Sequence, residues 1–175
     1  MNDIKVLVWI FPILFIFHDF EEIIMMQPWI KKNRAYLSDR FPKLAGKLLP
    51  HFDSITTASF ALGVFEEFIL ISLVSVVSFV SGSYGFWAGL FIAFTVHLII
   101  HCFQALAVRK YIPALITSLL CLPACYYILK HAIPIFTASE LIYNSLFGLL
   151  LMVLNLYAVH KGMTIFDKWQ ARYEK

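Results

Sequence analysis

Five long apolar segments constrain this chain more than any other feature of its sequence. A helix of about 20 apolar residues is long enough to cross the hydrocarbon core of a bilayer. The five segments cover residues 6–27, 55–80, 86–108, 112–131 and 140–160. Because 61% of the 175 residues are hydrophobic and only 14% are charged, a soluble domain of this size has too little interior to bury the apolar residues. The sequence therefore predicts an all-α integral membrane bundle of five transmembrane helices, formed by residues 1–175 as a single membrane domain.

Lysine and arginine residues predict the orientation of this bundle. Twelve of the fourteen lie in the segment 28–54, the link 109–111 or the tail 161–175, which are all on one side of the five predicted spans. Only Lys5 and Lys130 lie on the other side. Short loops rich in these residues stay in the cytoplasm. We therefore expect an outside N-terminus and a cytoplasmic C-terminus.

The bilayer is the first partner that the sequence indicates. Aromatic and aliphatic residues alternate with basic residues in the segment 28–54, and the tail 161–175 repeats large apolar residues every three or four positions. Both patterns predict amphipathic helices that lie on the membrane surface. The net charge of +3 is small, and the basic residues are spread over several loops, so nucleic acid is not an expected partner.

A charged motif interrupts the first predicted span. Residues 16–22 read IFHDFEE, in which His18 is followed three and four positions later by Glu21 and Glu22. This spacing places the three side chains on one face of a helix. In the third span, His97 and His101 share a face by the same rule. Imidazole and carboxylate groups at this spacing are the ligands of metal sites in helical bundles.

The ionisable residues of the first three spans fall at similar depths. Counted from the cytoplasmic end of each span, the depths are roughly 15 Å for His18, 16 Å for Glu66 and His97, 10 Å for His101 and 9 Å for Glu22. Each ionised group near the membrane centre costs at least about 2.5–3.5 kcal/mol. No lysine or arginine lies in these three spans to pair with the carboxylates. They are therefore expected either to hold protons or to surround a cation.

The predicted site is a divalent metal centre, with zinc favoured over iron and with one or two ions. Its predicted ligands are His18, Glu22, Glu66, His97 and His101. Glu21 and Glu67 are predicted as catalytic residues, of which one takes a proton from a bound water molecule. Within each pair of adjacent glutamates, the sequence does not distinguish the ligand from the base.

The remaining polar residues of the spans are assigned structural roles. Asp19 and Asn155, taken singly, are expected to hydrogen-bond their neighbours, and Asn155 is expected to reach the site from the last span. His51 and His160 lie near the membrane interface and His131 lies on the outer side, so none of the three histidines is predicted to belong to the site.

His18, Glu21 and Glu22 fit the pattern HxxEE, and the chain resembles a family of small prokaryotic integral membrane proteins named for that motif. The resemblance covers nearly the whole chain. It implies a metal-binding protein of the prokaryotic plasma membrane with the character of an enzyme, and it indicates no substrate. A looser similarity is to the glutamate-dependent intramembrane endopeptidases that process prenylated proteins. The chain differs from them because FILI follows Glu66 and Glu67, where that family has an arginine four positions after its second glutamate.

Three functions are compatible with these features. The first is a metal-dependent hydrolase that acts on a lipid or lipidated substrate near the cytoplasmic side. The second is a carboxylate-bridged di-iron oxidase or oxygenase of a lipid-soluble substrate, although the Glu-x-x-His order of di-iron bundles is absent. The third is an ion or proton transporter or sensor, in which the acids relay protons without catalysis.

Overall fold

The computed structural model describes residues 4–173, so the last two residues of the predicted tail lie outside the described part. All secondary structure in residues 4–173 is helical, as the sequence predicts. The elements are α1 (Ile4–Leu7), α2 (Ile10–Arg40), α3 (Pro42–Asp53), α4 (Thr57–Ser81), α5 (Gly85–Val108), α6 (Leu115–Ala132), the 3₁₀ turn η1 (Ile133–Ile135) and α7 (Ala138–Tyr173).

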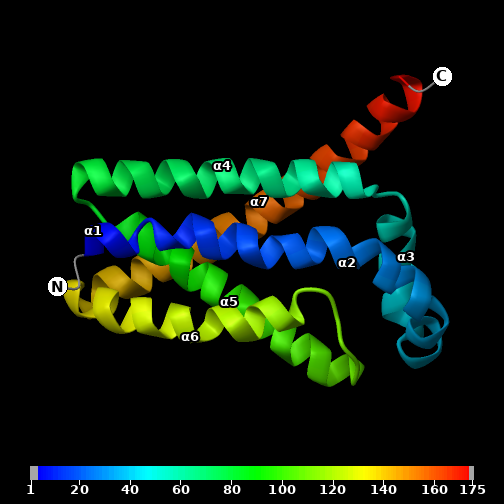
Figure 1. The fold of residues 1–175 in the computed structure, drawn as a ribbon, viewed down its shortest axis with the longest axis horizontal. Helices are drawn as coiled ribbons and strands as arrows, with labels where there is room; N and C mark the ends of the chain where they lie inside the picture. The colour runs from blue at the N-terminus through cyan, green and yellow to red at the C-terminus, as the bar shows by residue number, and fades with distance from the viewer. Residues whose placement is uncertain (1–3, 174–175) are drawn as a thin grey trace.

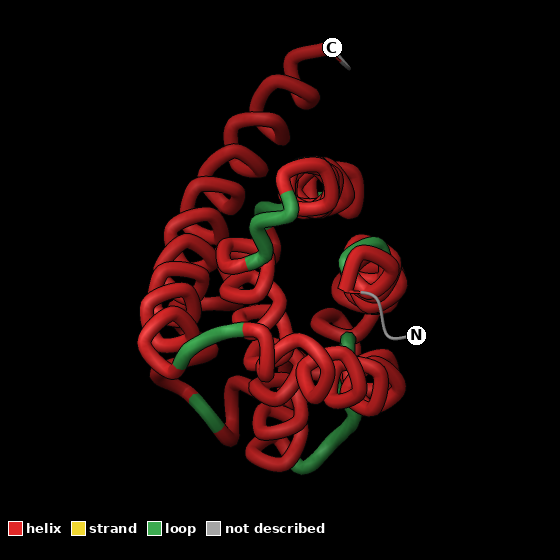
Figure 2. Tube along the Cα trace, turned by 90° about the vertical axis from the view of Figure 1, so that its left-hand side faces the viewer, coloured by secondary structure: helices red, strands yellow, loops and turns green. Residues whose placement is uncertain are grey.

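The long helices form two layers. In Figure 1, α2 lies between α4 and α6, and α5 and α7 cross behind these three helices. Figure 2 places α7 on one flank of the bundle and α2 on the opposite flank. The short helix α3 lies at the end of the bundle where α2 ends and α4 begins. We call this the basic end, because it also carries the ends of α5 and α7 and therefore most of the basic residues.

Four helices of the described chain are long and apolar enough to cross a membrane. They are Thr57–Ser81, Gly85–Val108, Leu115–Ile135 and Ala138–Tyr173. The helix α2 is not among them, because Asp19, Glu21 and Glu22 interrupt its apolar stretch. The predicted turn between the second and third spans is present, and Gly82 ends α4 there with a φ of 71°, a conformation that glycine adopts without strain.

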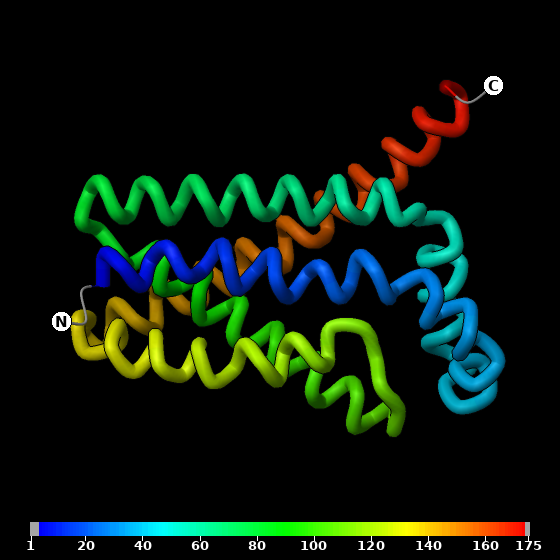
Figure 3. The backbone as a smooth tube through the Cα atoms, in the orientation of Figure 1, coloured from blue at the N-terminus to red at the C-terminus, as the bar shows by residue number. Residues whose placement is uncertain are grey.

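Two predicted boundaries differ from the structure. The first helix does not end near residue 27 but continues to Arg40, and α7 includes both the last predicted span and the described part of the tail (Figure 3). The extension of α2 is fixed against the end of α5 by two side chains that donate to free backbone carbonyls. The Trp29 indole N–H donates to the carbonyl oxygen of Tyr111 at 2.6 Å, and the Tyr36 hydroxyl donates to that of Val108 at 2.7 Å. Carbonyls at a helix end lack intrahelical donors, so these contacts stabilise both elements.

The extension of α7 is fixed at the start of α4. The carboxylate of Asp167 accepts hydrogen bonds from the hydroxyl of Thr56 at 2.7 Å and from that of Ser59 at 2.8 Å. Thr56 is the N-cap of α4, so the acid also lies at the positive end of the α4 dipole. The chain after residue 160 therefore continues as part of α7, because the Asp167 side chain is hydrogen-bonded to the start of α4.

Glycines allow α5 and α7 to pack closely. A Cβ atom added to Gly148 would overlap the backbone of Gly89, and one added to Gly89 would overlap the backbone of Asn144. Small residues at such crossings bring helix backbones together in membrane bundles. Beside this crossing, Phe11 of α2 packs edge-on against Trp87 and Phe91 of α5, and all three are almost fully buried. These contacts hold the α2 motif against α5.

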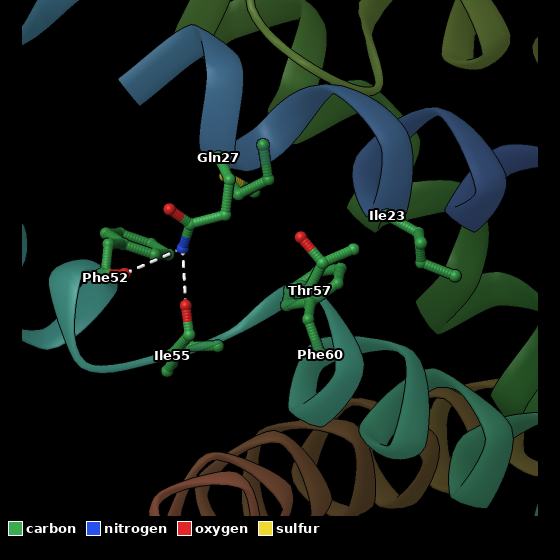
Figure 4. A pocket seen from close by; sticks show the side chains of 7 residues that line it. Ile23, Gln27, Phe52, Ile55, Thr57 and Phe60 are labelled. Atoms are coloured by element: carbon green, nitrogen blue, oxygen red, sulfur yellow. Dashed lines mark hydrogen bonds between the residues drawn. The ribbon is translucent and has the colours of Figure 1, made fainter. Parts of the chain in front are cut away.

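The link between α3 and α4 is attached to α2 through Gln27. Figure 4 shows its amide, which donates to the carbonyl oxygens of Phe52 at 2.9 Å and Ile55 at 2.5 Å. Ile23 and Phe60 lie beside these groups in the same narrow pocket. The amide satisfies two backbone carbonyls at the place where the chain leaves α3, and it fixes the basic end of the bundle relative to the HxxEE helix.

Candidate metal centre

Four side chains meet between α2 and α5. His18 and Glu22 come from α2, and His97 and His101 come from α5. Each offers one ligand atom, and these four atoms all lie within 4.8 Å of one another. His101 Nε2 lies 2.9 Å from His97 Nε2 and 3.1 Å from Glu22 Oε1. The structure thus brings together four of the five predicted ligands.

The geometry of this group fits a metal ion. Ligand atoms at about 2.0–2.2 Å from zinc, at tetrahedral corners, are about 3.3–3.6 Å from one another. The observed separations, from 2.9 Å to within 4.8 Å, lie on both sides of that value. His18 is fully buried, and its Nε2 atom has no hydrogen-bond partner in the described chain. A buried imidazole nitrogen without a partner is costly unless it binds something, so the donor set and its surroundings fit a cation.

Thr117 of α6 positions His18. Its hydroxyl lies 2.7 Å from Glu21 Oε2 and 3.2 Å from His18 Nδ1. Because the carboxylate only accepts, the hydroxyl donates to Glu21 and accepts from the Nδ1–H of His18. This assigns the ring proton to Nδ1 and leaves the lone pair of Nε2 free to bind a metal, which is the arrangement that outer partners of metal-bound histidines produce.

Glu21 also caps α6. Its carboxylate accepts from the backbone N–H groups of Thr117 at 2.7 Å and Ile116 at 3.4 Å, and from the hydroxyl of Tyr111 at 2.6 Å. Burial, together with the hydrogen bond to Glu21, raises the pKa of Tyr111 above its ordinary value, so the hydroxyl remains a donor. Glu21, the first glutamate of the HxxEE motif, therefore holds the start of α6 and, through Thr117, the ring of His18.

Glu66 and Glu67 lie on α4, beside the four-residue group. Asn155 of α7 contacts both, with its Nδ2 atom 3.2 Å from Glu66 Oε2 and 3.5 Å from Glu67 Oε1. Glu66 is exposed and is not part of the group of ligand atoms. Glu67 is half-buried and close enough to Glu22 for the two carboxylates to interact electrostatically. Of the two glutamates of α4 predicted to belong to the site, Glu67 is therefore the one that interacts electrostatically with the ligand group, through Glu22.

Asp19 is part of the same polar region. It is 5% exposed, and its Oδ2 atom has no hydrogen-bond partner among the described residues. It interacts electrostatically with both Glu22 and Glu67. The sequence predicted that Asn155 reaches the site from the last helix, and the structure confirms its contacts with Glu66 and Glu67. Asp19, to which the sequence assigned a structural role, lies beside Glu22 and Glu67.

Sequence reasoning missed Thr117 and Tyr111. Thr117 lies at the start of the fourth predicted span and Tyr111 in the link before it, and no ionisable residue near them points to a site. The start of this helix could have indicated such a contact. Its first backbone N–H groups need an acceptor, and the apolar residues nearby supply none.

Comparison with known proteins finds one family. The model of the family described as "Protein of unknown function with HXXEE motif" matches residues 9–128, which include His18, Glu22, His97 and His101. No curated protein and no solved structure shows significant similarity to the chain.

Proposed function

The chain belongs to the HXXEE-motif family, and we propose that it is a membrane-embedded metal-dependent hydrolase. One observation carries this proposal: three imidazoles and one carboxylate converge inside a bundle of membrane-length helices. The family match covers both helices that supply these four side chains.

His18, His97, His101 and Glu22 would hold the ion, which we propose to be zinc because nitrogen and carboxylate ligands in a four-membered set suit it. A zinc ion supplies Lewis acidity, which polarises an ester or amide carbonyl and makes water acidic near neutral pH. Glu67 would take the proton from the attacking water, since it is the half-buried carboxylate that interacts with Glu22. Glu21 would position His18 through Thr117.

The position of the site in the bundle indicates a lipid or lipidated substrate. We propose that α2 is a fifth span, with the N-terminus outside and the basic end in the cytoplasm of a prokaryotic cell. His18 and Glu22 would then lie roughly 15 Å and 9 Å from the cytoplasmic face. In an amphiphilic molecule of the cytoplasmic leaflet, the bonds just below the headgroup would lie at this depth, beside the ligand group.

Metal content and activity together test the proposal. Protein purified without a metal-affinity tag should contain about one zinc per chain. On a panel of lipid esters and lipopeptides, Glu67→Gln should keep the metal but lower the rate by about 10²–10⁴-fold. Glu66→Gln is the matched control, because it changes the adjacent exposed acid. Metal-free protein with full activity would refute the hydrolase proposal.

A di-iron oxidase is the second candidate, favoured by one observation. Asp19 and Glu67 both interact with Glu22, so a second group of carboxylates adjoins the first metal position. Such groups bridge two irons in carboxylate-rich bundles. If the purified protein contained about two irons per chain and showed an oxo-bridge absorption band, the oxidase would be favoured over the zinc hydrolase. A metal-free protein with Glu67-dependent ion flux in vesicles would instead indicate a transporter.

A further inference from the structure

A second pocket lies between α3 and α7, outside the four-ligand group. It has a volume of about 530 Å³. Its lining consists of His51 from α3 and of Tyr157, His160, Lys161, Thr164 and Ile165 from α7. The five α7 residues follow the spacing of a single helix face. None of the pocket's lining residues is acidic.

The polar atoms of this pocket suit an anion. His51 Nε2 and His160 Nδ1 lie 3.1 Å apart, so one ring donates to the other, and the accepting ring keeps the N–H of its other nitrogen for an external acceptor. The ammonium of Lys161 lies 4.4 Å from the centre of the Tyr157 ring. No ion pair in residues 4–173 involves Lys161, so an external anion has no competing carboxylate for this charge.

The surroundings of the pocket suit a lipid. Tyr157 and Ile165 are 62% and 68% exposed, and they flank Lys161 along the outer face of α7. An acyl chain can therefore lie along the apolar residues while a headgroup reaches the lysine. The pocket is at the basic end of the bundle, where the remaining basic residues attract anionic lipid. His160 of the pocket also interacts electrostatically with Glu22 of the metal centre.

We propose that this pocket binds the phosphate of an anionic membrane phospholipid, between Lys161 and the pair of His51 and His160. The inference rests on the proposed hydrolase function in one respect: the bound lipid would be the substrate, held by its phosphate while an acyl ester below the headgroup lies towards Glu22. Binding itself requires neither metal nor catalysis.

Lipid binding to the purified full-length protein tests the pocket. The protein would be titrated in detergent micelles with phosphatidylglycerol and with phosphatidylcholine, and bound lipid counted by native mass spectrometry. We expect a preference for phosphatidylglycerol that Lys161→Gln weakens about fivefold, since a lysine beside anionic lipid contributes on the order of 1 kcal/mol. Lys168→Gln, which removes the same charge from the same helix outside the pocket, should leave binding unchanged.

Three results would overturn the assignment. Equal losses in the Lys161 and Lys168 variants would mean that only the general charge of the basic end attracts lipid. Equal binding of both lipids would exclude phosphate-charge recognition. Competition by millimolar inorganic phosphate, with no lipid preference, would indicate a soluble anion. Zinc and activity measured in the same samples separate the two proposals, because lysine-dependent lipid binding by a metal-free protein with full activity would support the pocket and refute the metal-dependent hydrolase.

Discussion

Replacing Thr117 by valine isolates the contact that positions His18. Valine keeps the shape of threonine but removes the hydroxyl, which lies 2.7 Å from Glu21 Oε2 and 3.2 Å from His18 Nδ1. The Nδ1–H of a fully buried ring then loses its acceptor. An unsatisfied buried donor costs about 1–3 kcal/mol. Glu21 keeps its bonds from Tyr111 and from the backbone of residue 117, so the start of α6 should remain in place.

The effect on metal binding follows from the same geometry. Without its partner, the ring of His18 can rotate or move its proton to Nε2, and either change removes a ligand. Loss of such an outer contact typically weakens metal affinity about 10–100-fold, which is about 1.4–2.7 kcal/mol. We therefore expect Thr117→Val to raise the zinc dissociation constant by this factor, and to reduce the rise in melting temperature that zinc produces.

Chelator competition and thermal melts in detergent, each with and without zinc, measure these effects. Thr95→Val is the matched control, because the Thr95 hydroxyl donates at 2.8 Å to the Phe91 carbonyl of its own helix and does not contact the ligand group. A Thr117→Val protein that binds zinc as tightly as the wild type would refute the assignment of the Nδ1 proton, and with it the role given to Glu21.

Two further substitutions test the site and the packing. His18→Ala should abolish bound metal and lower the melting temperature, because it leaves the buried carboxylate of Glu22 without a cation. Metal analysis and thermal melts test this, and His131→Ala, in the last turn of α6 and outside the ligand group, should change neither quantity. Gly148→Ala should lower the free energy of unfolding by about 1–3 kcal/mol or more, because the new methyl group overlaps the backbone of Gly89. Gly46→Ala, where a methyl group meets nothing within 4 Å, should be neutral or stabilising in the same denaturation assay.

The sequence predicted the helical class and the later helices well, because each is apolar throughout and is bounded by turn-forming residues. The residues SGSYG at 81–85 ended one helix and began the next as expected. The ends of α2 and α7 were harder to predict. Both helices continue past the apolar segment because Tyr36 and Asp167 bind groups on other helices. Such contacts join residues more than 70 positions apart, so no local pattern reports them.

The site was predictable where helical spacing and depth were sufficient. His18 and Glu22 share a face of α2, and His97 and His101 share a face of α5. The predicted depths match in pairs, His18 with His97 and Glu22 with His101, which implied that the two faces meet. The division of roles between Glu21 and Glu22 was not predictable. Both lie on the motif face. Glu22 contacts α5 and Glu21 contacts α6, and this difference depends on how the helices pack against one another.

The carboxylates near the ligand group need positive charge to balance them inside the bundle. Asp19 and Glu22 are buried and Glu67 is half-buried, whereas the Arg34–Asp53 ion pair of the described chain lies at the exposed basic end. A divalent ion bound by neutral imidazoles brings two positive charges, which balance two of these three acids. With Glu22 as a ligand and Glu67 as the proposed base, the third acid is the buried Asp19. Each further ionised acid would cost at least about 2.5–3.5 kcal/mol, so Asp19 should keep its proton. In the proposed hydrolase, the charge balance that lets the acids stay in the bundle therefore also retains a proton near the metal, where a leaving group needs a donor.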